Sequence, residues 1–224
     1  MKTKASTSLK ELYSLLYNFF GPQQWWPAKT KFEVCVGAIL TQNTSWTNVE
    51  KAINKLKASK KLTLNGIASL SEKKLASFIR SSGYYNRKAK TLKAFCKHIL
   101  KNYDGNLEKF FSNSIDLLRE ELISIPDIGQ ETADSIILYA AEKPTFVVDA
   151  YTERIVARFY GKQFKKREEL KMFFERNLPK NTKLYNEFHA LLVVLAKNFC
   201  RKKPLCQNCP INKNCCYYEY KNLR

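Results

Sequence analysis

Residues 122–136 read LISIPDIGQETADSI, and this stretch organises the rest of the chain. We expect an apolar helix to end near Pro126, followed by a turn through Ile128 and Gly129 and then a second helix. The start of that second helix leaves backbone amides without intrahelical partners, so they can bind a phosphate without reading base sequence. Taken alone, the stretch is equally compatible with a plain helix–turn–helix corner.

A second short pattern follows at residues 146–152, which read FVVDAYT. Asp149 comes directly after an apolar run and at a predicted helix start, so we expect its carboxylate to be at least partly buried. By itself, this placement is better explained by an N-cap than by catalysis, since aspartate is a favoured capping residue.

Helical periodicity extends over most of the chain. Ser8 and Glu11 form a capping-box pattern before an apolar helical face, and Thr30 and Glu33 repeat it. Strand signals are restricted to residues 146–148, a run too short to build a sheet. The predicted fold class is therefore all-α, with further helices near residues 45–57, 71–81, 85–101, 114–124, 131–141, 150–160, 167–177 and 182–199.

The composition of the chain indicates which kind of molecule it binds. The 224-residue chain carries 39 Lys and Arg against 20 Asp and Glu, a formal net charge of +19, and 45% of its residues are hydrophobic. This is enough to build a core, and the charge predicts a polyanionic partner: nucleic acid first, an anionic membrane surface second. No apolar run reaches the ~18 residues of a membrane span, and residues 1–10 lack a signal-peptide-like segment. We expect a soluble cytoplasmic protein that is associated with the nucleoid and has no membrane partner.

Cysteines cluster near the end of the chain, at Cys200, Cys206, Cys209 and Cys215, with Cys216 adjacent. Four thiolates at this spacing can hold a tetrahedral zinc ion or a [4Fe–4S] cluster, and the residues alone leave the two nearly even. The spacing favours Cys215 over Cys216 as the fourth ligand. The two histidines, His98 and His189, have no ligand-like partners nearby in the sequence, and both are interpreted as structural.

Together these motifs resemble the helix-hairpin-helix DNA glycosylases of the endonuclease III superfamily, and the resemblance spreads over most of the chain. It rests on the hairpin at residues 125–133 followed by Asp149. In addition, residues 40–44 (LTQNT) are similar to the family's gap-filling segment, and residues 83–89 (GYYNRKA) to its second DNA-wedging loop. The terminal cysteines are similar to its iron–sulfur loop, although that loop usually has six residues in the first gap and this chain has five.

The resemblance implies two helical domains with a cleft between them. A six-helix barrel holding the helix-hairpin-helix would span residues 23–144, and residues 1–22 and 145–224 would form a helical domain with a [4Fe–4S] cluster loop. The implied partner is double-stranded DNA containing a damaged base, bound by a monomer, with a monovalent cation at the hairpin as a further expectation. The implied cluster ligands are Cys200, Cys206, Cys209 and Cys215.

Roles follow residue by residue. Asp149 matches the family's catalytic aspartate, which supports water attack at the sugar carbon and stabilises an oxocarbenium-like sugar. Gln42 matches the residue that fills the space left by the flipped nucleotide. DNA contacts are also implied for Asn43, Tyr84, Tyr85, Ile128, Gly129, Gln130 and Thr132, and for the basic residues Arg201, Lys202 and Lys203 in the cysteine loop.

Two departures from the family pattern lie in the hairpin. Glu131 stands where strand-cutting members carry a lysine, and a carboxylate cannot form a Schiff base. We therefore expect base release without AP lyase activity. Asp127 stands where the family usually has glycine, so its charge is expected near the bound phosphate. Aspartate tolerates the left-handed backbone angles of such a turn.

The base pocket is suggested by the tryptophans. Trp25, Trp26 and Pro27, together with Trp46, flank the Gln42 segment and are similar to pocket residues of the 3-methyladenine glycosylase branch. Glu131 also agrees with that branch and is counted with this pocket. N-alkylated purines are cationic, and stacked indoles attract a cationic ring by ~1–2 kcal/mol per face. Any one of these tryptophans has about even odds of being a core residue.

The expected function is hydrolytic release of an alkylated purine from duplex DNA in base excision repair. One alternative is a glycosylase of the same fold that acts on oxidised or mismatched pyrimidines or retains lyase activity, and the tryptophans argue against it. Another is a non-catalytic DNA-binding hairpin module stabilised by zinc, and the position of Asp149 relative to the hairpin argues against that.

Overall fold

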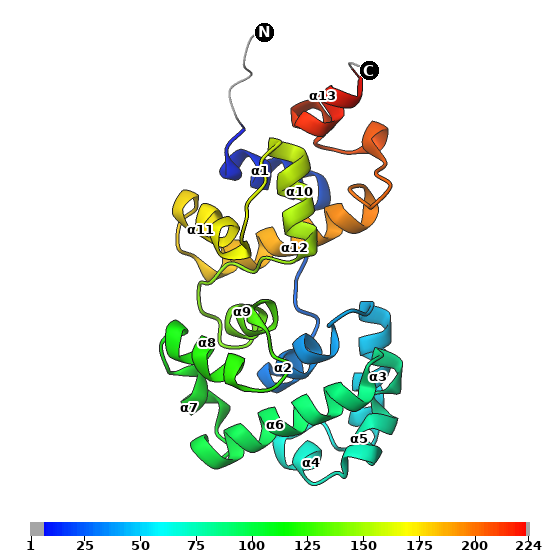
Figure 1. The fold of residues 1–224 in the computed structure, drawn as a ribbon, viewed down its shortest axis with the longest axis vertical. Coiled ribbons are helices and arrows are strands. Elements are labelled where there is room, and N and C mark those ends of the chain that lie inside the picture. The colour runs from blue at the N-terminus through cyan, green and yellow to red at the C-terminus, as the bar shows by residue number, and fades with distance from the viewer. Residues whose placement is uncertain (1–6, 223–224) are drawn as a thin grey trace. The chain divides into compact units, whose positions relative to one another are not determined.

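The computed structural model describes residues 7–222, and within them it contains helices and loops but no strand (Figure 1). The all-α prediction is confirmed. The helices are α1 (Leu9–Phe20), α2 (Lys31–Leu40), α3 (Trp46–Ala58), α4 (Leu64–Ala68), α5 (Glu72–Phe78), α6 (Tyr85–Tyr103), α7 (Leu107–Phe111), α8 (Ile115–Ser124), α9 (Gln130–Tyr139), α10 (Ala150–Tyr160), α11 (Arg167–Asn177), α12 (Thr182–Asn198) and α13 (Cys216–Asn222), with 3-10 turns at Arg80–Ser82, Cys206–Asn208 and Asn212–Asn214. None of the helices in this described part of the chain is long and apolar enough to cross a membrane.

The chain divides into two compact units. The continuous one, here called the hairpin unit, runs from Trp26 to Lys143, and the other combines the residues up to Trp25 with those from Pro144 onward. We call the second one the cysteine unit because it contains the terminal cysteines. The sequence-based boundaries were drawn between residues 22 and 23 and between residues 144 and 145.

Side-chain caps define where several helices begin. Ser8 Oγ accepts a hydrogen bond from Glu11 N, and Glu11 accepts one from Ser8 N, so the predicted capping box is closed. Thr30 Oγ1 accepts from Glu33 N in the same way, but the expected reciprocal bond is replaced. Glu33 is buried and its carboxylate accepts instead from Lys29 N and from Lys57 Nζ, at 3.2 and 2.5 Å. A buried carboxylate needs a charged partner, and Lys57 supplies it.

Helix α2 forms the centre of the hairpin unit. Every residue from Phe32 to Leu40 is buried, as expected for a helix that is covered on all sides. It packs against α3, α6 and α9, and α6 packs in turn against α4 and α5. Residues 41–44, most of the predicted gap-filling segment, therefore follow directly on a buried central helix.

Aromatic stacking forms the core of the cysteine unit. Phe146 stacks on Phe174 with ring centroids 4.0 Å apart, and both meet the edge of Phe188. Helix α12, which carries Phe188, packs against α1 and α10. Residues 146–148, the run with weak strand character, are buried without forming a strand, and they lead straight to the start of α10. This packing fixes the position of Asp149.

Candidate active site

The hairpin joins α8 and α9 through a tight turn. Ile125 and Ile128 are both buried, and Ile128 N donates to Ile125 O at 3.1 Å, so the turn is anchored in the core at both ends. Gly129 is the N-cap of α9 and provides no side-chain cap, while Gly129 and Gln130 are exposed. An exposed helix start without a capping side chain is suited to an anion. The side chain of Ile128 faces the core, so a DNA contact there would be made by its backbone.

Asp127, the unusual residue of the hairpin, adopts left-handed backbone angles with φ +65°. Its carboxylate oxygen lies 2.6 Å from Arg87 Nη2 on α6. This ion pair offsets the negative charge that the sequence placed next to the expected phosphate. Arg87 was not singled out from the sequence because nothing local relates it to the hairpin.

The gap-filling segment is hydrogen-bonded to the same hairpin. Gln42 Nε2 donates to Asp127 O at 2.8 Å and to Thr132 Oγ1 at 3.0 Å. The next residue, Asn43, has a positive φ of +53° and is exposed. Two of the sequence-predicted DNA contacts, Gln42 and Thr132, are therefore brought together within the hairpin unit.

The predicted second wedging loop, residues 83–89, carries an exposed aromatic side chain. Gly83 has φ +67°, a conformation that favours glycine, and Tyr84 follows with φ +44°. Tyr84 is 68% exposed, whereas large aromatic side chains are normally buried to a greater extent. Tyr85 begins α6, and the Arg80 guanidinium lies 5.9 Å from its ring centroid. An exposed ring at a loop tip has the form of a DNA wedge.

Two of the three tryptophans meet in the hairpin unit. The Trp26 ring lies edge-on to Trp46, with centroids 5.4 Å apart, and 5.2 Å from the ring of Tyr139 on α9. A Cβ atom at Gly37 would come within 3.1 Å of Trp26 Nε1, so this glycine allows the indole to lie against α2. Tyr139 was missed by the sequence reasoning because it lies on a helical face that reads as core.

The remaining proposed pocket residues are Trp25, Pro27 and Glu131. Trp25 belongs to the cysteine unit, and its ring centroid lies 5.8 Å from Lys197 Nζ. All three tryptophans are partly exposed rather than fully buried, while Pro27 and Glu131 are exposed. Glu131 lies in the first turn of α9, where acidic residues are favoured. The structure thus brings together Trp26, Trp46 and an additional tyrosine, and it gives Trp25 a cationic neighbour.

Asp149 is the N-cap of α10, and its two oxygens have different surroundings. Oδ1 accepts hydrogen bonds from Thr152 N at 2.7 Å and from Thr152 Oγ1 at 2.9 Å. Oδ2 lies 3.6 Å from Nε2 of His189, which is carried by α12. The capping and catalytic interpretations are therefore compatible, because capping uses one oxygen only.

The surroundings of Asp149, including His189, favour the ionised form of its carboxyl group. Burial opposes ionisation of Asp149, but the His189 interaction and the Thr152 hydrogen bonds outweigh it and lower the pKa to about 2. The sequence offered no partner for His189, because it lies forty positions from Asp149 and only the packing of α12 on α10 brings the two together. His98, by contrast, pairs with Glu121 at 2.6 Å.

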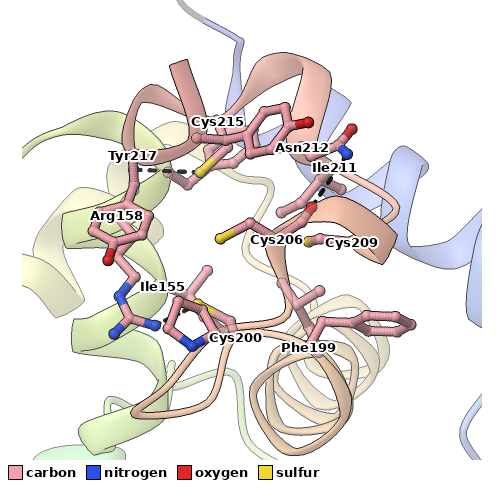
Figure 2. Close-up of a pocket in the computed structure, with 14 residues that line it drawn as sticks. Ile155, Arg158, Phe199, Cys200, Cys206, Cys209, Ile211, Asn212, Cys215 and Tyr217 are labelled. Atoms are coloured by element: carbon pink, nitrogen blue, oxygen red, sulfur yellow. Dashed lines mark hydrogen bonds between the residues drawn. The ribbon is translucent and has the colours of Figure 1, made fainter. Parts of the chain in front are cut away.

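The terminal cysteines line an apolar pocket (Figure 2). Cys200, Cys206, Cys209 and Cys215 line it together with side chains such as Ile155 and Phe199. Cys216 is exposed and is not among the lining residues. Within the described residues, no three His, Cys, Asp or Glu side chains are arranged to hold a single metal ion.

Arg158 on α10 holds the cysteine loop in place. Its Nη1 donates to Arg201 O at 2.6 Å and lies 3.4 Å from Cys200 Sγ, and its Nη2 donates to Lys202 O at 3.2 Å. Arg201, Lys202 and Lys203 themselves are exposed. The loop therefore exposes three cationic side chains to solvent, while Arg158 holds its backbone by hydrogen bonds.

These features together define a class of protein: an all-helical helix-hairpin-helix protein in which an ionised aspartate caps a helix and a terminal loop carries four cysteines around one pocket. The chain belongs to the HhH-GPD superfamily of base excision DNA repair proteins, whose family model matches residues 36–180. The resemblance seen in the sequence is confirmed, and the protein is a DNA glycosylase of base excision repair.

Relatives agree on the family but differ in substrate. A putative DNA repair glycosylase of Methanocaldococcus jannaschii is 50% identical over 96% of this chain and 99% of its own. A thymine-DNA glycosylase of Aeropyrum pernix is 29% identical over 91% of each chain. The crystal structure of the H. pylori 3-methyladenine DNA glycosylase bound to 1,N6-ethenoadenine aligns with a TM-score of 0.75 and 32% identity, covering 84% of this chain and 96% of that one.

Proposed function

We propose that this glycosylase releases alkylated purines, of which 3-methyladenine is representative, from double-stranded DNA by hydrolysis. The observation that carries the proposal is the aromatic group formed by Trp26, Trp46 and Tyr139. Partly exposed indoles select a flat cationic ring by stacking and cation–π attraction. The similarity to a 3-methyladenine glycosylase at 32% identity supports the same substrate class.

In this proposal Asp149 acts on the sugar. When the base departs, positive charge develops on the sugar ring, and a carboxylate that is ionised at neutral pH stabilises that charge and orients the attacking water. An alkylated base is already a good leaving group, so the site needs no strong general acid. Thr152 and His189 hold the carboxylate in place.

We also propose that the enzyme leaves an abasic site without cutting the strand. A lyase step requires an amine that attacks the sugar, and Glu131 at the start of α9 offers a carboxylate instead. Sodium borohydride should therefore trap no covalent complex with the substrate duplex. Efficient trapping would mean that another lysine acts as the nucleophile.

The cysteine loop fits a polynuclear iron–sulfur group. Four cysteines around one apolar cavity suit a [4Fe–4S] cluster, whereas a single zinc ion would require its ligands to converge on one point. The proposed ligands are Cys200, Cys206, Cys209 and Cys215, and the lining favours Cys215 over Cys216. When bound, such a cluster would tie the four thiolates together and stabilise the loop.

A pyrimidine substrate is the second candidate, favoured by the 29% identity to a thymine-DNA glycosylase. A panel of duplex oligonucleotides separates the two, with 3-methyladenine, oxidised pyrimidines and mismatched thymine as targets, scoring free base and strand cleavage independently. We expect methylated purine to be released by the wild type and not by Asp149→Asn, whose amide can still cap α10. Release of pyrimidines alone would overturn the alkylpurine assignment.

A further inference from the structure

Lys88 is a buried lysine that no role described so far explains. It lies in the first turns of α6 and is 2% exposed. Its Nζ donates to three backbone carbonyl oxygens, those of Leu40, Gln42 and Ser82, at 2.8, 2.8 and 2.7 Å. An ammonium group has three protons, so its donor capacity is fully used by these three acceptors.

The three acceptors belong to two separate segments. Leu40 ends α2 and Gln42 lies in the gap-filling segment, whereas Ser82 comes immediately before Gly83 and the wedge residue Tyr84. Carbonyls at helix ends lack intrahelical partners and need other donors. One ammonium group therefore links two DNA-wedging segments that are forty residues apart in the chain.

The hairpin is connected to the same network. The side chain of Gln42 donates to Asp127 O and Thr132 Oγ1, and Arg87, the neighbour of Lys88, pairs with the Asp127 carboxylate. Each of the three segments also contains a non-glycine residue at positive φ: Asn43, Tyr84 and Asp127. Such backbone is unfavourable by itself and persists where surrounding bonds hold it.

We propose that Lys88 is a positioning residue that fixes the gap-filling segment and the Tyr84 loop relative to each other, so that the two act on DNA as one rigid wedge. The proposal rests on the glycosylase function, because it concerns how the base is extruded. Base stacking and pairing oppose extrusion of the nucleotide by a few kcal/mol. If the two loops became ordered only on binding, the cost of ordering them would reduce the binding free energy that is available for extrusion.

The test compares Lys88→Met with Lys93→Met. Methionine keeps an apolar stem of similar length but donates nothing. Lys93 is the matched control because it lies on the same helix and donates from Nζ to Ala68 O and Leu70 O, at the end of α4 and away from the wedging segments. Both variants lose hydrogen bonds from a lysine to backbone carbonyls. Only Lys88→Met should change the position of the gap-filling segment relative to the Tyr84 loop.

Two readouts are measured. On the lesion that the wild type processes, kcat/KM for Lys88→Met should fall at least about 10-fold in a fully paired duplex and less than about 3-fold when the lesion is unpaired, since extrusion is then already achieved. The second readout uses a duplex with a tetrahydrofuran abasic site and 2-aminopurine opposite it. Wild type and Lys93→Met should raise the 2-aminopurine fluorescence at saturation, and Lys88→Met should bind with little increase.

The proposal would be overturned if kcat/KM of Lys88→Met fell equally on paired and unpaired lesions. It would also be overturned if Lys88→Met, at saturation, raised the 2-aminopurine fluorescence as much as the wild type does. The fluorescence assay needs no base that the enzyme excises, so it separates failure of the wedge from failure of the substrate assignment. If Lys88→Met does not fold, Lys88→Gln keeps two of the three N–H donors, and an intermediate fluorescence rise is expected. A full wild-type rise with that variant would also count against Lys88.

Discussion

At the scale of single residues, the two histidines of this chain provide a natural comparison. His189 faces Asp149, and its interaction helps to lower the pKa of that carboxyl to about 2. Replacing it with glutamine removes the Coulombic interaction with the imidazole that lowers this pKa, so the pKa of Asp149 should rise. The acid limb of the single-turnover pH–rate profile should therefore move to higher pH in His189→Gln.

The control for this prediction is His98→Gln, since His98 pairs with Glu121 in the other unit. Its profile should match that of the wild type. An unchanged acid limb in both variants would show that His189 does not act on Asp149.

The same pKa shift affects folding. Asp149 has a lower pKa in the folded protein than its ordinary value of 3.8, so its ionised form stabilises the fold above about pH 4. This contribution is lost as the pH falls through the interval from 3.8 towards 2. Urea titrations at a series of pH values should show a shallower loss of stability over that interval in Asp149→Asn.

Trp46 and Trp25 give a second residue-scale comparison. Trp46 contacts Trp26, whereas the Trp25 ring lies near Lys197. Loss of one stacking face removes ~1–3 kcal/mol, so Trp46→Ala should reduce kcat/KM on methylated purine by roughly 5- to 150-fold. Phenylalanine at this position should keep part of the activity because a weaker π face remains.

Affinity of Trp46→Ala for an abasic-site duplex should stay close to that of the wild type, because phosphate and wedge contacts lie elsewhere. Trp25→Ala should lose less activity than Trp46→Ala. Equal losses for Trp46→Ala on methylated purine and on an oxidised pyrimidine would contradict selection of a cationic ring.

At the scale of elements, the cysteine loop makes the clearest prediction. Cys206 lines the cavity, and the nearby Cys216 is exposed outside it. The purified protein should be yellow-brown with roughly four irons per chain. Cys206→Ala should lose iron and solubility, and Cys216→Ser should keep both. A colourless protein with one zinc per chain would contradict the cluster assignment.

Sequence patterns predicted the long helices because caps and periodicity are local. Helices α4 and α7, capped by Thr63 and Asn106, were missed since each has only five residues and too few turns to show a periodic face. The hairpin and Asp149 could also be found locally. The ionic partners of three acidic residues could not be found from the sequence, because helix packing alone brings them together. These pairs are Asp149 with His189, Asp127 with Arg87, and Glu33 with Lys57.

At the scale of the whole molecule, the net charge of +19 predicts strongly salt-dependent DNA binding. Each phosphate neutralised by a cation adds about 0.9 to the slope of log affinity against log salt. Lys202 is exposed on the cysteine loop, so Lys202→Gln should lower the magnitude of that slope by about one unit, equally for damaged and undamaged duplexes. An unchanged slope would place this loop outside the DNA contact.

The division into two units has a consequence for biosynthesis. The hairpin unit is one continuous segment, but the cysteine unit is built from segments on both sides of it. During translation, α1 is made before the hairpin unit and must wait for its partner α12 until the hairpin unit has left the ribosome. The cysteines of residues 200–216 are made after Lys143, so the hairpin unit can fold before the cysteine loop is synthesised. Chains whose cysteine unit is not yet assembled would then already carry a folded hairpin unit.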